Sequence, residues 1–241
     1  MNSTKSNIFQ FKQFAVDQTG CGMKINTDGV LLGALVQSEG PSSILDIGTG
    51  TGVVALMLAQ RFSDAQVDAI EIDNKAALTA QYNFNTSQFT KRLKCYQESF
   101  QDFSKQYPDK KYDLIVSNPP FFTNSLKNPD DQKQLARHAS HDLFKELISF
   151  ARQHLTPKGS CYLILPLEAA RQIIESAFEY SMKLQSVISI KSSASKAAHR
   201  QIITVGFGNI EKDEEEFIIY QSEKVYSDQY QNVLKDFLTI F

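Results

Sequence analysis

The sequence has few cysteines, no long apolar run and no strong excess of charge of either sign. Its three cysteines, Cys21, Cys95 and Cys161, lie far apart, and no CxxC or Cys/His spacing is present. Neither a disulfide framework nor a metal site is therefore indicated, and reduced thiols are expected. No stretch approaches the roughly 18 apolar residues of a membrane span, and the N-terminus lacks a signal-peptide core. We expect a cytoplasmic protein with no metal and no membrane partner.

The formal net charge of the 241 residues is only −2. A protein with this balance does not coat nucleic acid, so any RNA contact must come from a local patch of Lys and Arg. The length suits a single domain over residues 1–241, with residues 1–40 as a small extension beside the site. The oligomeric state does not follow from the sequence, and a monomer is the simplest expectation.

Short apolar segments alternate with helix-like segments from residue 43 onward. This alternation predicts an α/β fold with a doubly wound, Rossmann-like and mostly parallel sheet. Two late strands without a helix between them add an antiparallel C-terminal hairpin, whereas the acidic run 213–216 is expected to be a solvated turn. Strands are predicted at 9–14, 43–47, 66–72, 93–97, 113–117, 161–165, 184–190, 201–207 and 217–220. Helices are predicted at 30–35, 53–61, 75–86, 141–154, 167–180 and 228–238.

A glycine loop follows the strand at 43–47 and opens the next helix. Its sequence is Asp46-Ile47-Gly48-Thr49-Gly50-Thr51-Gly52. Glycines there allow the backbone to pass close to a ligand and to adopt dihedral angles that a Cβ forbids. Glu71 ends the second strand, where a carboxylate that binds ribose hydroxyls is expected. A nicotinamide site and a plain tight turn are the alternatives. The acid at the head of the loop favours S-adenosylmethionine, because it could balance the ammonium group at the amino-acid end of this ligand.

The strand at 113–117 ends in Asn118-Pro119-Pro120-Phe121. Because ligands bind at the carboxyl ends of the strands in open α/β sheets, this motif and the glycine loop should share one crevice. A ring-conjugated amine is a poor nucleophile, so it needs acceptors that hold its N–H groups. The side-chain oxygen of Asn118 and the carbonyl of Pro119 are such acceptors, and Pro120 fixes the backbone. Phe121 offers an apolar face on which a base can stack.

These motifs resemble the bacterial tRNA1(Val) (adenine-37-N6)-methyltransferase family within the class I methyltransferases. The resemblance covers roughly residues 9–207, and its most distinctive part is Met-Lys-x-x-Thr-Asp-Gly-x-Leu-Leu-Gly-Ala at 23–34. It implies methylation of the adenine N6 amine with S-adenosylmethionine as cofactor, and tRNA as partner. The cofactor contacts that it implies are Thr27, Asp46, Gly48, Gly50, Gly52, Glu71 and Asn118. It places Ser99 at the cofactor's adenine, with Glu98 as the alternative.

The resemblance and the distribution of basic residues also suggest an RNA-binding rim. Its candidates are Lys12, Lys24, Arg137, His138 and Arg200. The Asn-Pro-Pro-Phe chemistry by itself leaves other acceptors open, namely a guanine N2 amine in ribosomal RNA or a glutamine amide in a release factor. A binding protein that kept the cofactor pocket and lost catalysis is a further alternative. The run at 23–34 favours tRNA.

Overall fold

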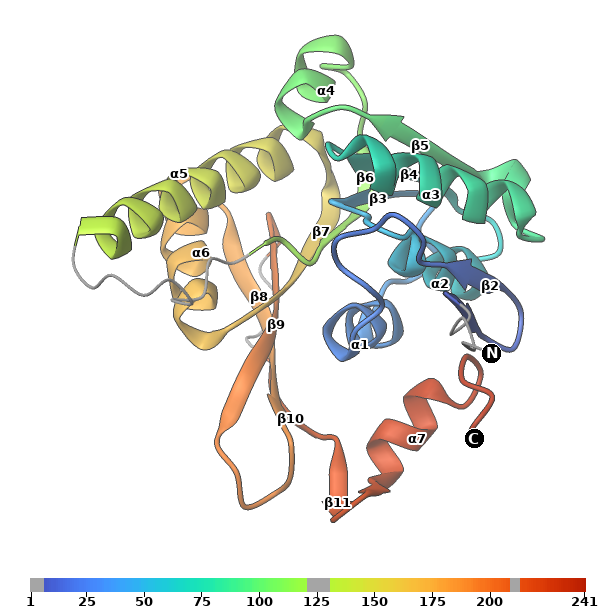
Figure 1. Ribbon diagram of the computed structural model, residues 1–241. Helices are drawn as coiled ribbons and strands as arrows, with labels where there is room; N and C mark the ends of the chain where they lie inside the picture. Colours follow the sequence, from blue (N-terminus) through green and yellow to red (C-terminus); the bar gives the residue numbers. More distant parts are fainter. Residues whose placement is uncertain (1–6, 121–130, 209–212) are drawn as a thin grey trace.

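The computed structural model describes residues 7–120, 131–208 and 213–241, apart from the side chains of residues 131–141 and 213 (Figure 1). Its strands are β1 (Ile8–Gln10), β2 (Ala15–Asp17), β3 (Ser43–Ile47), β4 (Gln66–Glu71), β5 (Leu93–Gln97), β6 (Tyr112–Ser117), β7 (Leu155–Leu165), β8 (Lys183–Lys191), β9 (Ala198–Gly206), β10 (Asp213–Ile218), β11 (Tyr220–Ser222) and β12 (Val225–Tyr226). Its α-helices are α1 (Thr27–Leu35), α2 (Val53–Arg61), α3 (Asn74–Thr86), α4 (Phe100–Gln106), α5 (Asp131–His154), α6 (Leu167–Glu179) and α7 (Asp228–Leu234).

Strands β3 to β10 form a central sheet in the order β10-β8-β9-β7-β6-β3-β4-β5. All neighbours are parallel except β9, which runs antiparallel to both β7 and β8. The predicted mostly parallel sheet with a late antiparallel hairpin is therefore confirmed. The carboxyl ends of β3, β4, β5, β6, β7, β8 and β10 lie at one edge of the sheet, which we call the carboxyl edge.

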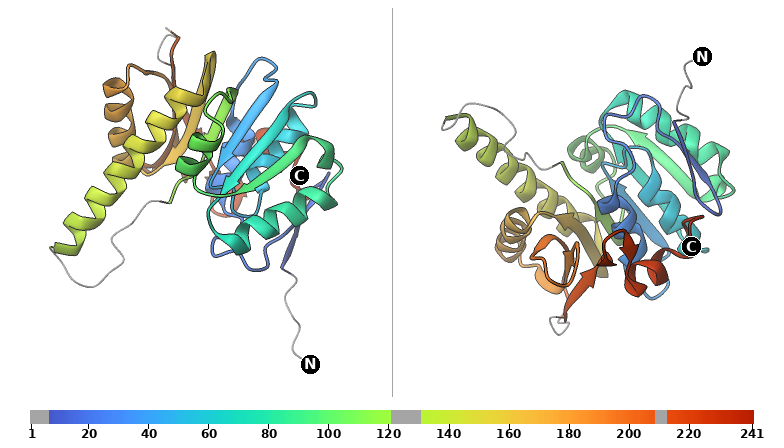
Figure 2. Two further views of the ribbon diagram at one scale, coloured as in Figure 1. Left: turned by 90° about the horizontal axis from the view of Figure 1, so that it is seen from above. Right: turned by 60° about the horizontal axis from the view of Figure 1, so that its bottom comes forward.

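Alternate residues of the inner strands face opposite helical layers. Along β6, Leu114 and Val116 pack in a cluster that includes α1, α2, α3 and α7, whereas Ile115 packs in a cluster with α4, α5 and α6. Figure 2 shows α5 and α6 on one side of the sheet and α3 on the other. Apolar residues on both faces of a strand are typical of a parallel sheet covered by helices on both sides.

The N-terminal residues pack beside the C-terminal segment. Phe11 is fully buried and forms an isolated bridge with Leu238, and the backbone N–H of Lys12 donates to the carbonyl of Phe237 at 2.8 Å. Phe11 and Phe14 belong to the same hydrophobic cluster as α1 and α2. The division into a domain and an extension of residues 1–40 stays a prediction.

The structure corrects several predicted boundaries. The segment 9–14 is not one strand, because β1 and β2 form an antiparallel hairpin around a turn. Helix α4 was not predicted, since its seven residues are too few for a clear helical period, and α5 begins ten residues earlier than predicted. The acidic run 213–216 lies in β10 and pairs with β8, not in a turn. Glu214, Glu215 and Glu216 are exposed, and charged residues suit an edge strand because they oppose pairing with other chains.

Candidate active site

The glycine loop connects β3 to α2 at the carboxyl edge. Gly52 has a φ of +83° and directly precedes α2, and a Cβ at this position would lie 2.6 Å from Cε1 of Phe84. Gly50 has a φ of +56°, and nothing lies within 4 Å of the position that its Cβ would occupy. Both dihedral angles fall in the left-handed region that favours glycine. The loop therefore keeps open space beside Gly50 and packs tightly beneath Gly52.

The carboxylate of Glu71 is tied to this loop. It accepts the backbone N–H of Gly50 at 2.9 Å through one oxygen and the N–H of Asp73 at 2.8 Å through the other. Glu71 is buried, and each of its oxygens retains capacity to accept another hydrogen bond. The predicted acid at the end of β4 is therefore held in a fixed orientation next to the loop, as a ribose-binding carboxylate requires.

Asp46 lies at the end of β3 and is almost completely buried. Its carboxylate accepts the hydroxyl of Thr49 at 2.6 Å. Burial raises the pKa of Asp46 to about 7, against the hydrogen bonds from Thr49 and the backbone of Ala55, which lower it. A nearby cation would favour the ionised form. Asp46 is thus poised to balance the ammonium group of an amino-acid ligand.

Asn118 follows β6 on the other side of the loop. The adjoining Ser117 hydroxyl donates to the carbonyl of Ile47 at 2.8 Å and so fixes the end of β6 against β3. Oδ1 of Asn118 is buried and has no hydrogen-bond partner among the described residues. Leaving a buried polar atom without a partner costs free energy, so such an atom is expected to have a ligand to bind. Pro119 is buried, Pro120 is exposed, and Phe121 lies outside the described residues.

Two adjoining cavities meet at Gly48. A smaller cavity of about 50 Å³ is lined by Asp46, by residues 48–51 of the glycine loop and by Asn118, and we call it the polar cavity after these side chains. An apolar cavity of about 190 Å³ lies on the other side and is lined by residues that include Ile72, Glu98, Ser99, Pro119 and Pro120. S-adenosylmethionine has a charged amino-acid end, a ribose and an adenine. The residues present fit this group, because the unpaired acceptor of Asn118, the buried acid Asp46 and the carboxylate of Glu71 follow the neighbouring strands β6, β3 and β4, and an apolar cavity adjoins them.

The segment from Met23 to Gly29 forms another wall of the polar cavity. Met23, Lys24, Ile25, Asn26 and Gly29 line it. Asn26 caps α1 by accepting the N–H of Gly29 at 2.9 Å. The predicted contact Thr27 is exposed and is not among the lining residues, although its neighbours are. The distinctive sequence run thus borders the place where Asn118 presents its oxygen.

Glu98 and Ser99 both line the apolar cavity, but their side chains are engaged differently. Ser99 caps α4, because its hydroxyl accepts the N–H of Asp102 at 3.0 Å and donates to the Asp102 carboxylate at 2.8 Å. Burial raises the pKa of Glu98, and the nearby Asp102 carboxylate adds to this effect. The Ser99 hydroxyl is therefore committed to the helix, whereas no hydrogen bond of this kind engages the Glu98 carboxylate in the described residues.

The predicted basic rim is only partly assembled at the cavities. Lys24 lines the polar cavity, and Arg200 lies nearby because its Nε donates to Asp28 in the first turn of α1 at 2.8 Å. The side chains of Arg137 and His138, which are on α5, lie outside what the structure describes.

Lys12 is located elsewhere. Its ammonium donates to the carbonyl of Lys235 at 2.5 Å, and the neighbouring Gln13 carbonyl accepts from Gln88 beyond the end of α3. Helix α3 starts at the carboxyl edge and has 13 residues, which corresponds to about 20 Å. Lys12 therefore lies toward the opposite edge, and its RNA contact stays a prediction.

Sequence reasoning missed Asn83, which ties β2 to the glycine loop. It is buried in α3; its Nδ2 donates to the carbonyls of Asp17 and Thr51 at 2.9 and 2.8 Å, and its Oδ1 accepts the N–H of Asp17 at 2.9 Å. Ile72 was also missed; it is 73% exposed and lines the apolar cavity. An apolar residue that directly follows the acid of the second strand is a signal that could have identified Ile72.

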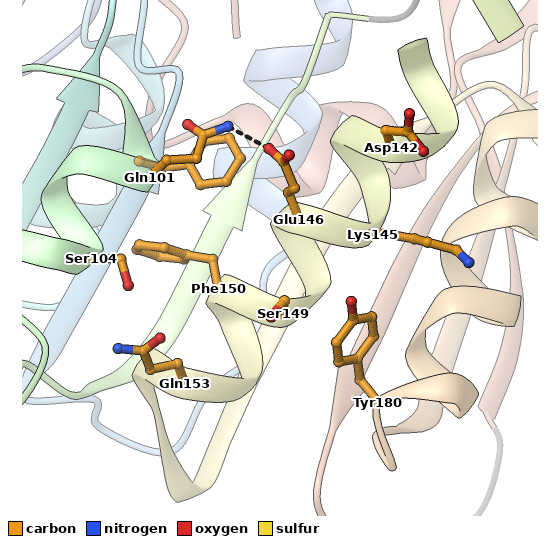
Figure 3. A pocket seen from close by; sticks show the side chains of 10 residues that line it. Gln101, Ser104, Asp142, Lys145, Glu146, Ser149, Phe150, Gln153 and Tyr180 are labelled. Carbon is orange, nitrogen blue, oxygen red and sulfur yellow. Dashed lines mark hydrogen bonds between the residues drawn. The ribbon is translucent and has the colours of Figure 1, made fainter. Parts of the chain in front are cut away.

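An open groove of about 460 Å³ lies beside the apolar cavity, between α4, α5 and the end of α6 (Figure 3). Three of its polar side chains are already paired, because Gln101 donates to Glu146 at 2.6 Å and Lys145 forms an ion pair with Glu179 on α6 at 2.9 Å. The groove includes none of the strand ends that carry the motifs. It is therefore not the candidate active site.

The fold and the arrangement of Asp46, Glu71 and Asn118 at one sheet edge define a class I S-adenosylmethionine-dependent methyltransferase. A family model described as Methyltransferase small domain matches residues 24–187. A tRNA1(Val) (adenine(37)-N6)-methyltransferase of Pedobacter heparinus is 46% identical, with 98% of this chain and 99% of the relative covered. Another of Actinobacillus pleuropneumoniae is 37% identical, with 97% and 98% covered. The chain belongs to the tRNA1(Val) (adenine(37)-N6)-methyltransferase family.

Solved structures support the fold. A predicted O-methyltransferase, Atu636 of Agrobacterium tumefaciens, has a TM-score of 0.69 at 17% identity, with 87% of this chain and 96% of that chain covered. TrmN of Thermus thermophilus has a TM-score of 0.56 at 17% identity, with 74% and 47% covered. At this identity the likeness concerns the arrangement of helices and strands. In the described ranges no helix is long and apolar enough to span a membrane.

Proposed function

We propose that this chain methylates the N6 amine of adenine 37 in the anticodon loop of tRNA1(Val). The observation that carries the amine chemistry is the buried, unpartnered Oδ1 of Asn118 at a cavity shared with the glycine loop. The choice of acceptor is supported by the full-length similarity to relatives that bear this name.

Asn118 and Pro119 act on the acceptor amine. The Oδ1 of Asn118 accepts one N–H of the amine and the carbonyl of Pro119 accepts the other, which favours a pyramidal nitrogen whose lone pair is less delocalised into the ring. When bound, S-adenosylmethionine supplies an electrophilic methyl group. The protein then acts mainly by positioning the two reactants, because holding them in the correct orientation removes much of the entropic part of the activation barrier. The Asn118 amide is not basic, so the proton of the methylated amine passes to water.

The cofactor side of the crevice provides three separate contacts. Asp46 balances the ammonium group of the amino-acid end, and Glu71 accepts the ribose hydroxyls. Glu98, whose carboxylate is less engaged than the Ser99 hydroxyl, is the better candidate for the adenine amine. Gly48 and Gly50 let the backbone approach the ligand without steric conflict.

The tRNA lies on the part of the carboxyl edge formed by β6, β7 and the β8–β9 hairpin. We assign stacking on the base to Phe121 and phosphate contacts to Lys24, Arg137 and His138. Adenine 37 sits in an unpaired loop, so its presentation costs less than extrusion from a duplex. The loop, the acid and Asn118 come from one chain, so a monomer is sufficient for catalysis. As a tRNA-modifying enzyme the protein would work in the cytoplasm.

The acceptor is tested by offering the purified protein three substrates with labelled S-adenosylmethionine. These are total tRNA, ribosomal RNA and a release factor that carries the target glutamine. We expect label in tRNA, recovered as N6-methyladenosine after digestion to nucleosides.

Label in N2-methylguanosine would show that the acceptor is a guanine N2 amine, and label in methylglutamine would show that it is a glutamine amide. Either result would contradict the proposed acceptor. If the protein binds S-adenosylhomocysteine but labels none of the three, it is a binding protein without catalytic activity. Asn118→Ala serves as the matched negative control, because it removes the proposed acceptor atom and leaves the glycine loop unchanged.

A further inference from the structure

An ion pair joins two elements that are far apart in the sequence. Nε of Arg200, on β9, donates to Oδ2 of Asp28, in the first turn of α1, at 2.8 Å. The side chains are 25% and 20% exposed. By contrast, the ion pair between Arg171 and Glu168 on α6 has side chains that are 65% and 68% exposed. Solvent screens the Asp28–Arg200 pair much less than the α6 pair, so it has more influence on the position of its two elements.

The α1 end of this pair belongs to the wall of the polar cavity. Asn26 and Gly29, on either side of Asp28, both line the cavity, and the Asn26 side chain caps the helix through the N–H of Gly29. A carboxylate in the first helical turn is also favoured by the helix dipole. A shift of Asp28 would therefore displace the residues that face the cofactor's amino-acid end.

The β9 end of the pair belongs to the hairpin on the acceptor side. Arg200 lies opposite Ile190 of β8, and the loop at 192–197 joins the two strands at the carboxyl edge. The other strand end of this hairpin is held by an ion pair between Lys191 and Glu216 of β10 at 2.5 Å. The planar guanidinium of Arg200 also donates through Nη1 to the carbonyl of His199 at 3.0 Å. Its orientation is therefore fixed toward α1.

We propose that Arg200 is a positioning residue, which acts through Asp28 to hold the start of α1 against the cofactor. This role differs from the RNA-rim contact that the sequence suggested for Arg200. The inference rests on the proposed function only for the hairpin's place beside the tRNA. Arg200 thus connects the hairpin, which borders the tRNA, to α1, which borders the cofactor. Loss of the ion pair should therefore weaken cofactor binding even when no RNA is bound.

The test is calorimetric titration of the protein with S-adenosylhomocysteine in the absence of tRNA. Arg200→Ala and Asp28→Ala should each raise the dissociation constant about tenfold, the scale of a lost hydrogen bond to a charged group. Asp28→Asn keeps an acceptor but loses the charge, so its effect should be smaller. The double variant Asp28→Ala/Arg200→Ala should be no worse than either single variant, because each change breaks the same pair. Arg171→Ala, which breaks an exposed pair at the same sheet edge, should change nothing.

A second measurement separates positioning from phosphate contact. Binding of tRNA without cofactor is followed over a range of salt concentrations. The proposal expects Arg200→Ala to leave the salt dependence unchanged, because no phosphate contact is lost. The proposal is overturned if Arg200→Ala lowers the salt slope by about one, as loss of a phosphate contact does, while S-adenosylhomocysteine binds as in the unaltered protein.

Unfolding temperatures show whether each variant is folded. If Arg200→Ala does not fold, Arg200→Lys tests the inference in its place. Lysine restores a cation without the planar fork, so an intermediate dissociation constant is expected, and a wild-type value for both Arg200→Lys and Asp28→Asn contradicts the role. If the unaltered protein produces no N6-methyladenosine but the titrations behave as described, the proposed function fails and the positioning role stands.

Discussion

On the cofactor side of the crevice, both oxygens of Glu71 accept backbone N–H groups, and the buried Asp46 accepts the Thr49 hydroxyl. On the acceptor side, Oδ1 of Asn118 is also buried but has no partner among the described residues. The cofactor side is thus preorganised by internal hydrogen bonds, whereas the acceptor side retains an unsatisfied group, to which our proposal assigns the substrate amine. Changes on the two sides should therefore have different kinetic signatures.

Asn118→Ala should give the largest effect. We expect kcat to fall by about 10² to 10³-fold, the range observed when one positioned hydrogen-bonding group is removed from an active site. The affinity for S-adenosylhomocysteine should be nearly unchanged, because the glycine loop is not altered and the proposal assigns Oδ1 of Asn118 to the acceptor amine, although the family resemblance also implies a cofactor contact for this residue. Steady-state kinetics and titration measure the two quantities. Asn85→Ala, which truncates an exposed amide on α3, is the matched control, and a large loss of cofactor affinity in Asn118→Ala would show that this residue belongs to the cofactor side.

Glu71→Gln should have its main effect on cofactor affinity. The amide places an NH2 group opposite one of the two backbone N–H groups that the carboxylate now accepts, so a buried donor loses its partner. We expect the dissociation constant to rise by about 10 to 100-fold, which corresponds to roughly 1.5–3 kcal/mol. The kcat at saturating cofactor should change much less. Glu175→Gln on the exposed face of α6 controls for loss of charge, and equal behaviour of the two variants would argue against the ribose contact.

The pH dependence of cofactor binding should report on Asp46. Because burial raises its pKa to about 7, the carboxylate becomes ionised as the pH rises through this value. An ammonium-bearing ligand prefers the ionised form, so affinity for S-adenosylhomocysteine should increase about tenfold between about pH 6 and pH 8. The stability of the free protein changes in the opposite direction, because the contribution of a carboxyl with a raised pKa is lost as the pH rises toward 7.

Two variants sharpen this prediction. Asp46→Asn should remove the pH dependence, and Thr49→Val, which removes a hydrogen bond to the carboxylate, should move the midpoint to higher pH. If the affinity of Asp46→Asn for S-adenosylhomocysteine still rises tenfold between about pH 6 and pH 8, a group other than Asp46 is responsible for the pH dependence.

Lys12→Met should have the smallest effect. Its ammonium holds the carbonyl of Lys235 in an exposed contact, so stability should fall by no more than about 1 kcal/mol in a denaturant titration. The affinity for tRNA should be unchanged, because Lys12 lies away from the cavities. Lys24→Met is the contrasting variant, since Lys24 lines the polar cavity. Weaker tRNA binding in Lys12→Met would instead support the RNA contact that the sequence suggested for Lys12.

The cofactor side could be largely predicted from the sequence, because its chemistry is local. Asp46, Gly48, Gly50 and Gly52 are close in the chain, and Glu71 ends the adjacent parallel strand, so strand order alone brings them together. The structure confirms this sheet. Asn83 was not predictable in the same way, because its three hydrogen bonds join segments 66 and 32 residues away. A polar residue on the buried face of a helix does not indicate which backbone groups it satisfies.

The surroundings of the acceptor side depended on long-range contacts. Arg200 was selected for its charge alone, whereas its pairing with Asp28 spans 172 residues and determines which way it points. Lys12 was selected in the same way, and its partner lies 223 residues away. The acidic segment 213–216 has no apolar alternation, so only its position at the sheet edge explains why it forms a strand. Charge in a sequence indicates possible partners but not their location.

The central claim is that Asn118 presents a single adenine amine of the anticodon loop to the methyl donor. The most direct measurement is the number of methyl groups transferred to a transcript of tRNA1(Val) and to the same transcript with adenine 37 replaced by guanine, each analysed as nucleosides. The account predicts transfer to the first transcript up to one N6-methyladenosine per molecule and none to the second. Equal methylation of both transcripts, or methylation of the first transcript by Asn118→Ala at the rate of the unaltered protein, would contradict it.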